Sequence, residues 1–186
     1  MEYSKNVRNI LESLTQTEGR RLNSSMLEAE HIFLALMKLP DSSAMKILIK
    51  LGINFEILKK NIDKNLQSKA GPIYIGDIPL APGYNKVVKL ARDETSFLKD
   101  DKIQTVHLLL ALFKYRNVSG IQNLIEAGID YGTIASELRD QKMERDFAGV
   151  SKKKKENGKT SLADFTVNLN WSGCRGRGNR LSRGGN

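Results

Sequence analysis

The amino-acid sequence repeats itself at a constant spacing of 76 residues. Residues 31–38 read His-Ile-Phe-Leu-Ala-Leu-Met-Lys, and residues 107–114 read His-Leu-Leu-Leu-Ala-Leu-Phe-Lys. The same spacing, held without gaps, matches residues 5–66 to residues 81–142. A match of this length indicates two copies of one structural unit that pack together. The chain must therefore fold as a duplicated domain.

Each half of the repeat has the apolar spacing of four helices. In the first half, the second helix (residues 28–39) is apolar almost all round, so we expect it to be buried. Gly52 follows the third helix where a left-handed cap needs no Cβ, and Asn54 is placed to cap the fourth. Gly128 and Asp130 repeat this turn in the second half. The sequence predicts an all-α fold of eight helices, pseudo-twofold and without strands.

Composition divides the chain into a body and a basic tail. Residues 149–186 hold nine basic and two acidic side chains, whereas residues 1–148 hold 21 and 19. The net charge of +9 therefore belongs mostly to the tail. We expect a helical domain over residues 1–146. Its halves are joined by a Pro- and Gly-rich connection at 67–82, and we expect Ile73, Tyr74 and Ile75 to hold this connection against the domain surface. Residues 147–160 read as a charged, flexible linker.

Motifs that carry catalysis are missing from the sequence. Cys174 is the single cysteine, which excludes a disulfide within the chain and a Cys-rich metal site. His31 and His107 each begin an apolar helix, so we interpret them as histidines bonded near a helix N-terminus and not as metal ligands. No Gly-x-Ser-x-Gly or phosphate-binding Gly-x-x-x-x-Gly-Lys-Ser/Thr motif occurs. A small hydrolase that uses a histidine stays an alternative, but the sequence favours a binding module without a cofactor.

The doubled motif resembles the amino-terminal domain of Clp-type AAA+ ATPases. The residues that carry the resemblance are Glu30 to Leu36, their counterpart His107 to Leu112, and two Leu-Ile-x-x-Gly-Ile segments. The likeness covers roughly residues 2–145. Residues 161–170 are similar to the segment that enters the first ATPase module, through Leu162, Phe165, Asn168 and Leu169. Residues 171–186 depart from the family pattern, with five glycines and four arginines.

The resemblance implies a function in protein capture. In the family, this domain holds unfolded or tagged protein substrates, or adaptor proteins, for a hexameric AAA+ ring that unfolds them, in some members for a Clp peptidase. ATP and Mg²⁺ belong to the ATPase modules, which this chain lacks, so we expect it to bind without catalysis. Apolar runs are too short for a membrane span, and the charged N-terminus is unlike a secretory signal. We therefore expect a cytoplasmic protein.

The resemblance also implies binding residues. The family's apolar groove corresponds here to Val88, Leu90 and His107, and the alternative for Val88 and Leu90 is plain core. Some members bind phosphorylated arginine through a glutamate that precedes the motif histidine; Glu30 matches this position, and Val106 replaces it in the second half. The alternative for Glu30 is a first-turn carboxylate favoured by the helix dipole.

The tail leaves a second function open. An Arg-Gly segment can bind RNA, and a stand-alone nucleic-acid-binding protein that acts through residues 171–186 is the alternative hypothesis. The segment has no aromatic residue beyond Trp171, and the body is close to neutral. We therefore favour a truncated, vector-derived or frameshifted end for these residues, and we do not expect nucleic acid as a partner of the body.

Overall fold

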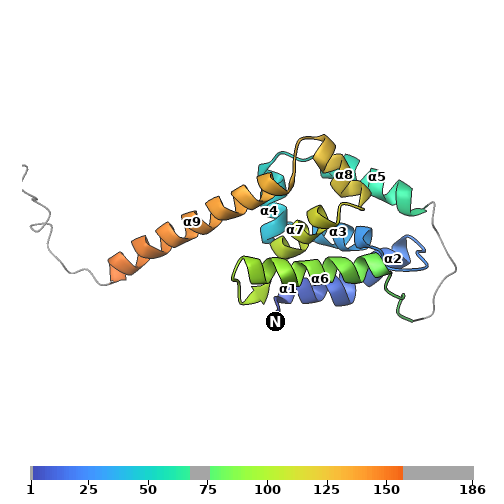
Figure 1. Cartoon of the computed structure of the whole chain (residues 1–186), viewed down its shortest axis with the longest axis horizontal. Helices are drawn as coiled ribbons and strands as arrows, with labels where there is room; N and C mark the ends of the chain where they lie inside the picture. Colours follow the sequence, from blue (N-terminus) through green and yellow to red (C-terminus); the bar gives the residue numbers. More distant parts are fainter. Residues whose placement is uncertain (1, 68–75, 157–186) are drawn as a thin grey trace, which may run out of the picture. The chain divides into compact units, whose positions relative to one another are not determined.

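The computed structural model describes the backbone of residues 2–67 and 76–156 and the side chains up to Glu144. The first repeat holds α1 (Lys5–Asn9), a π-helical turn η1 (Ile10–Leu14), α2 (Thr15–Arg21), α3 (Ala29–Met37), α4 (Ser43–Lys50) and α5 (Phe55–Gln67). The second holds α6 (Pro82–Phe97), α7 (Thr105–Tyr115), α8 (Ser119–Glu126) and α9 (Tyr131–Glu156). Because α1, η1 and α2 are continuous, the described chain has the eight predicted helices (Figure 1).

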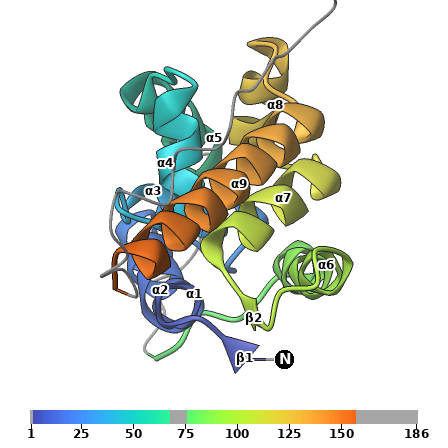
Figure 2. The same ribbon diagram turned by 90° about the vertical axis from the view of Figure 1, so that its left-hand side faces the viewer.

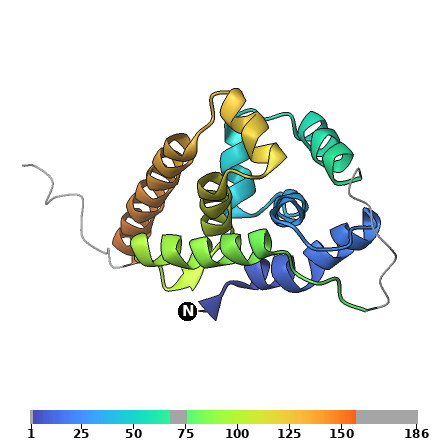
Figure 3. The same cartoon turned by 45° about the vertical axis from the view of Figure 1, so that its right-hand side comes forward.

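The two apolar helices lie at the centre of the fold, as their composition predicts. In α7 every residue from Thr105 to Phe113 is buried, and in α3 every residue from Ala29 to Leu36 is buried. Helix α3 packs against α2, α4, α5, α6, α7 and α8, so both repeats share one core. The long helix of each repeat, α1–α2 and α6, lies along one side of this core (Figures 1 and 3).

Short strands connect the repeats, although the sequence predicts none. Strand β1 (Glu2–Tyr3) pairs in parallel with β2 (Lys102–Ile103), which precedes α7 (Figure 2). Leu27, which precedes α3, pairs in parallel with Leu80, which precedes α6. The segment that enters each repeat is therefore hydrogen-bonded to the other repeat. The prediction of no strands was wrong because strands of one or two residues are too short to show an alternation of apolar and polar side chains. Their pairing also depends on a segment distant in sequence.

The connection between the repeats is described from Gly76 onward, and Ile73, Tyr74 and Ile75 lie outside the described residues. Ile78 is 3% exposed, and the Gln16 side chain bonds both to its backbone N–H (3.0 Å) and to its carbonyl (3.2 Å). The end of the connection is thus fastened to α2.

The compact unit comprises Met1–Arg145. Helix α9 begins inside it and continues to Glu156, into the region 147–160 where the sequence predicts a flexible linker. The backbone of residues 147–156 is thus helical, and the rest of that region, 157–160, lies outside the described residues together with the segment 161–170 and the Arg-Gly end 171–186, which stay predictions. Among the described helices, none is long and apolar enough to span a membrane.

Candidate functional site: an apolar cleft between the repeats

The doubled Gly-Ile turn has the conformation that its sequence predicts. Gly52 and Gly128 both adopt positive φ, at 72° and 83°, as residues just after a helix end often do. The Asn54 side chain accepts hydrogen bonds from the N–H groups of Glu56 and Ile57, both at 3.2 Å, and caps α5. Asp130 caps α9 in the same way, accepting from Thr133 N–H at 2.8 Å. Both helix ends and both caps are confirmed.

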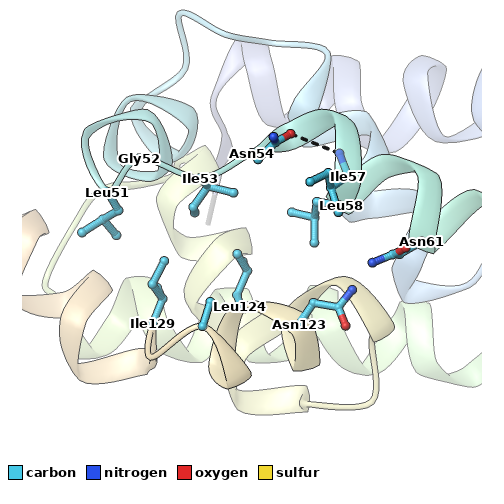
Figure 4. A pocket seen from close by; sticks show the side chains of 11 residues that line it. Leu51, Gly52, Ile53, Asn54, Ile57, Leu58, Asn61, Asn123, Leu124 and Ile129 are labelled. Atoms are coloured by element: carbon cyan, nitrogen blue, oxygen red, sulfur yellow. Dashed lines mark hydrogen bonds between the residues drawn. The ribbon is translucent and has the colours of Figure 1, made fainter.

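The two turns face one another and form the walls of an apolar cleft. Its volume is about 350 Å³. The first repeat supplies the turn after α4 and the start of α5, and the second supplies the end of α8 and the turn after it (Figure 4). The lining residues are Leu51, Gly52, Ile53, Asn54, Ile57, Leu58, Asn61, Asn123, Leu124, Ala127 and Ile129.

The cleft combines apolar walls with uncharged polar groups. Leu58 and Leu124 at its floor are buried, whereas Ile57 at its rim is 58% exposed. Three asparagines are the only lining residues with polar side chains, and no lining residue is ionisable. An exposed aliphatic residue beside a concave apolar surface is typical of a binding site. Sequence reasoning missed this cleft, although Ile57, which falls beside the buried stripe of Leu58 and Ile62, is a signal that could have indicated it.

The two histidines have equivalent structural roles. The Nδ1 atoms of His31 and His107 each accept the backbone N–H of the residue that precedes their helix, at 2.9 Å. The proton of each neutral ring is therefore on Nε2, which lies 2.9 Å from Ser24 Oγ in the first repeat and 2.9 Å from Asp100 Oδ2 in the second. Neither ring has exposed surface. The interpretation of both as histidines bonded at a helix N-terminus is confirmed.

Burial also determines how these histidines titrate. Desolvation lowers the pKa of both His31 and His107, and the carboxylate of Asp100 offsets this only in part for His107. Both rings are thus neutral at physiological pH. The resemblance implies that His107 contacts a ligand directly. In this fold its side chain is enclosed and has no surface that a ligand could touch.

Two buried carboxylates that were not among the sequence-predicted residues occupy equivalent positions of the two repeats. Glu18 and Glu94 have no exposed surface, and each forms an ion pair with the lysine at the end of its repeat's apolar helix, Lys38 and Lys114. Arg21 also pairs with Glu18, at 2.7 Å. Burial alone raises the pKa of Glu18, but the bonds from Lys38 and Arg21 outweigh it and hold that pKa below its ordinary value.

The second carboxylate has a different additional partner. The Tyr131 hydroxyl donates to Glu94 Oε2 at 2.9 Å. Burial and this acceptor raise the pKa of Tyr131 to about 12. Charged pairs of this kind, with every partner inside one repeat unit, belong to the architecture of the fold and not to an exposed site.

Glu30 borders a separate, small cavity. It is 9% exposed and lies in the first turn of α3. The cavity has a volume of about 270 Å³ and is lined by Glu28, Ala29, Glu30, Ala81, Gly83, Tyr115 and Asn117. The lining includes two carboxylates and no basic side chain. It therefore offers a partner for a guanidinium group but no cation for a phosphate.

Val88 and Leu90 lie on α6, half-buried and packed against the core. They line neither the apolar cleft nor the cavity beside Glu30. The four sequence-predicted residues thus lie on three helices, with Glu30 on α3, Val88 and Leu90 on α6, and His107 on α7. Among the described residues, His, Cys, Asp and Glu side chains form no group of three or more that could hold a metal ion.

Comparison with known protein families places the chain by a match to a family model. The model of the Clp repeat (R) N-terminal domain matches residues 2–127. The probable ATP-dependent Clp protease ATP-binding subunit of Chlamydia pneumoniae is 30% identical over 125 residues, which cover 67% of this chain and 15% of the relative. The ATP-dependent Clp protease ATP-binding subunit ClpC of Staphylococcus aureus (strain N315) is 31% identical over 115 residues, or 62% of this chain and 14% of the relative. The chain thus spans about a seventh of the length of these relatives.

Solved structures show the same fold. The Hsp104 N-terminal domain of Candida albicans has a TM-score of 0.61 at 17% identity, over 74% of this chain and 89% of that one. The N-terminal domain of the ClpV1 ATPase of Escherichia coli has a TM-score of 0.58 at 16% identity, over 73% and 82%. The N-terminal domain of the chaperone ClpD of Arabidopsis thaliana has a TM-score of 0.57 at 18% identity, over 76% and 95%.

Proposed function

Because this chain belongs to the family of Clp repeat (R) N-terminal domains, we propose that it is a docking domain that captures protein substrates or adaptor proteins for a Clp-type ATPase. The observation that carries the proposal is the family match over residues 2–127, the whole length of both repeats except the last helix. The ATPase ring, and a Clp peptidase where one takes part, lie outside this chain. Its own contribution is binding, in the cytoplasm, without ATP or Mg²⁺.

The surface of the described body supports capture of apolar segments. Met26, Ile57 and Phe97 are 40%, 58% and 75% exposed, and Ile49, Leu80, Ile125 and Met143 are exposed as well. Weak apolar contacts on a rigid helical platform suit many different unfolded sequences. Residues 147–160 would serve as the linker that keeps captured chains near the ring, which raises their local concentration.

Two sites follow from the family resemblance. Val88 and Leu90 would line a groove for apolar segments, because their half-buried side chains leave part of α6 apolar at the surface. Glu30 would bind a guanidinium group in the cavity that it shares with Glu28. His107 would act on the groove from beneath, by fixing the start of α7 through its bond to the Gln104 N–H.

The function can be tested with a permanently unfolded protein. The probe is fluorescein-labelled, reduced and carboxymethylated α-lactalbumin, and its fluorescence anisotropy is followed as the full 186-residue chain is added. We expect saturable binding of this probe and none of native α-lactalbumin. Absence of binding to the unfolded probe would contradict a capture function.

Substitutions on α6 then test the groove. We expect Val88→Ser and Leu90→Ser each to weaken binding about fivefold, because each removes apolar contact of roughly 1 kcal/mol. Lys89→Ser, at the exposed position between them, is the matched control and should leave the affinity unchanged. Far-UV circular dichroism checks that each variant keeps its helices. Equal affinities for all four proteins would exclude the α6 groove.

A further inference from the structure

The apolar cleft receives different side chains from the two repeats. Its walls come from equivalent turns, but Ile57 and Asn61 of α5 correspond to Thr133 and Glu137 of α9. Thr133 is bonded to the Asp130 carboxylate through both its N–H and its hydroxyl, and Glu137 forms an ion pair with Lys50. The second repeat thus uses these positions within the fold, whereas the first presents them to the cleft.

Two amide groups in the cleft have unused hydrogen-bonding capacity. Figure 4 shows Asn61 from α5 and Asn123 from α8 at the same end of the cleft. Neither side chain forms a hydrogen bond or ion pair with any residue that the structure describes. Each amide offers two N–H donors and one carbonyl acceptor. A ligand that carries both donors and acceptors in alternation would satisfy them.

The lining also restricts the charge and size of a ligand. Because no lining residue is ionisable, a charged or phosphorylated group placed there would lose its hydration without gaining an ionic partner. The cavity volume of about 350 Å³ is at the small end of the range of roughly 300–1,000 Å³ that ligand sites occupy. The cleft therefore suits a few aliphatic side chains and not a large folded surface.

The unpaired amides distinguish between an extended and a helical ligand. In a helix, the backbone N–H and C=O groups are bonded to one another, so the amides of Asn61 and Asn123 would stay unpaired against it. In an extended chain, these groups point outward and alternate with the side chains. An extended aliphatic segment can therefore fill the apolar walls and pair with both amides at once.

We infer that the cleft between α5 and α8 is a binding site for an extended, uncharged, aliphatic peptide segment, whose side chains contact Ile53, Ile57 and Ile129 and whose backbone is bonded by Asn61 and Asn123. The inference rests on the proposed capture function and adds a second site, apart from Val88 and Leu90 on α6. It also specifies the class of ligand, an uncharged aliphatic segment in an extended conformation.

The test uses two synthetic peptides and the full chain. The first peptide is fluorescein-labelled Gly-Ser-Gly-Val-Leu-Val-Ile-Gly-Ser-Gly. The second has the same sequence with N-methyl groups on the amides of both valines and the isoleucine, which remove backbone donors and keep the apolar side chains. Anisotropy titrations measure both affinities, and ¹H–¹⁵N correlation spectra of the chain locate the bound peptide. We expect the first peptide to bind with shifts centred on the cleft residues, and the second to bind about tenfold more weakly.

Protein variants complete the cycle. We expect Asn61→Ala and Asn123→Ala each to weaken binding of the first peptide about three- to tenfold, as the loss of one or two hydrogen bonds implies. They should weaken binding of the N-methylated peptide less, because that peptide keeps only its carbonyl acceptors for the two amides. Ile57→Ser should weaken both peptides. Asn85→Ala, an exposed asparagine on α6, is the matched control and should change neither affinity.

The outcomes separate this inference from the proposed function. Binding of the first peptide with shifts on α6, or with equal affinity for Asn61→Ala, Asn123→Ala and the unchanged chain, would overturn the cleft site and leave the capture function standing. Equal affinities for the two peptides would overturn the role of backbone bonding. No binding of either peptide while unfolded α-lactalbumin binds would overturn the inference alone, and no binding of any probe would overturn both.

Discussion

His31 and His107 are the two histidines of the chain, and both are enclosed without exposed surface. Each ring accepts the N–H of the residue that precedes its helix and donates from the opposite nitrogen, so both ring nitrogens are used. Protonation of Nδ1 would remove the acceptor and put a charge in an apolar helix end. The burial that lowers both pKa values therefore connects these residues to the stability of the fold.

Stability should fall as the pH decreases below about 6.5. In the unfolded chain both imidazoles take up a proton around the ordinary value of 6.5, whereas the folded chain resists it because both pKa values are lowered. Between the folded-state and unfolded-state pKa values, the unfolded chain therefore binds more protons than the folded chain. For each histidine, every unit of difference between these pKa values lowers the free energy of unfolding by about 1.4 kcal/mol. Urea unfolding followed by circular dichroism at pH 7.5 and 5.5 checks this, and we expect a lower midpoint at pH 5.5.

The control for this prediction replaces both imidazoles. His31→Asn with His107→Asn keeps an amide oxygen that can accept the same backbone N–H but has no proton to gain. The double variant should be less stable at pH 7.5, and its midpoint should change much less between the two pH values. A midpoint of the unchanged chain that is equal at both pH values would show that the rings are not enclosed in solution.

At the scale of the element, the ends of the helices follow from local sequence. Ser42 caps α4 by accepting from Met45 N–H, Asn54 and Asp130 cap α5 and α9, and the glycines at 52 and 128 adopt positive φ. The sequence predicts the caps at Asn54 and Asp130 and the turns at both glycines, because each depends on residues within one turn. Two features of the elements do not follow from it, namely the π-helical turn η1 and the short strands, since both depend on residues from the other repeat.

The π-helical turn illustrates this limit. The Leu11 carbonyl within it accepts bonds from the Thr15 hydroxyl at 3.1 Å and from the Tyr84 hydroxyl of α6 at 3.2 Å. No pattern within residues 5–21 indicates a hydroxyl that arrives from α6. The apolar cleft was missed for the same reason, because the facing of α5 and α8 is set by the packing of both helices on α3.

The Gly-Ile turn predicts a position-specific cost. Gly128→Ala should destabilise the domain by about 1–2 kcal/mol, because an alanine pays for the left-handed conformation at φ 83° although no atom lies within 4 Å of the added Cβ. Gly52→Ala should cost about the same. Urea unfolding measures both.

Gly132→Ala, in the first turn of α9, is the matched control for the Gly-Ile turn. Its nearest neighbour to an added Cβ is Asp130 Oδ1 at 3.4 Å, an ordinary contact. A helical glycine replaced by alanine gains up to roughly 1 kcal/mol, so this variant should be neutral or more stable. A loss of stability for Gly132→Ala equal to that for Gly128→Ala would show that the glycine conformation is not the cause.

At the scale of the whole compact unit, the repeats depend on one another. The segment that enters each repeat is paired with the other, and α3 contacts α6, α7 and α8 of the second repeat. The duplication was readable from the sequence because it rests on identical residues at one spacing. The reciprocal pairing was not, since a tandem arrangement of two separate bundles would have the same sequence pattern.

This interdependence predicts that the domain unfolds in one step. Far-UV circular dichroism and tyrosine fluorescence should give coincident urea transitions for the full chain. The fragments 2–67 and 76–145, made separately, should each lack cooperative unfolding, because each leaves one side of its apolar helix exposed. Two separated transitions, or a fragment that unfolds cooperatively by itself, would show that the repeats are independent.

The buried pairs of Glu18 with Lys38 and of Glu94 with Lys114 have a consequence for the evolution of such a domain. Loss of the lysine leaves each buried carboxylate with its other partner alone, Arg21 for Glu18 and the Tyr131 hydroxyl for Glu94, which costs more than exchanging both members for apolar residues of similar size. A substitution of one member alone is therefore disfavoured, whereas a simultaneous substitution of both members is tolerated. Descendants of the ancestral half-unit should accordingly retain either both members or neither. The glutamate and lysine positions should therefore co-vary within each copy of the repeat.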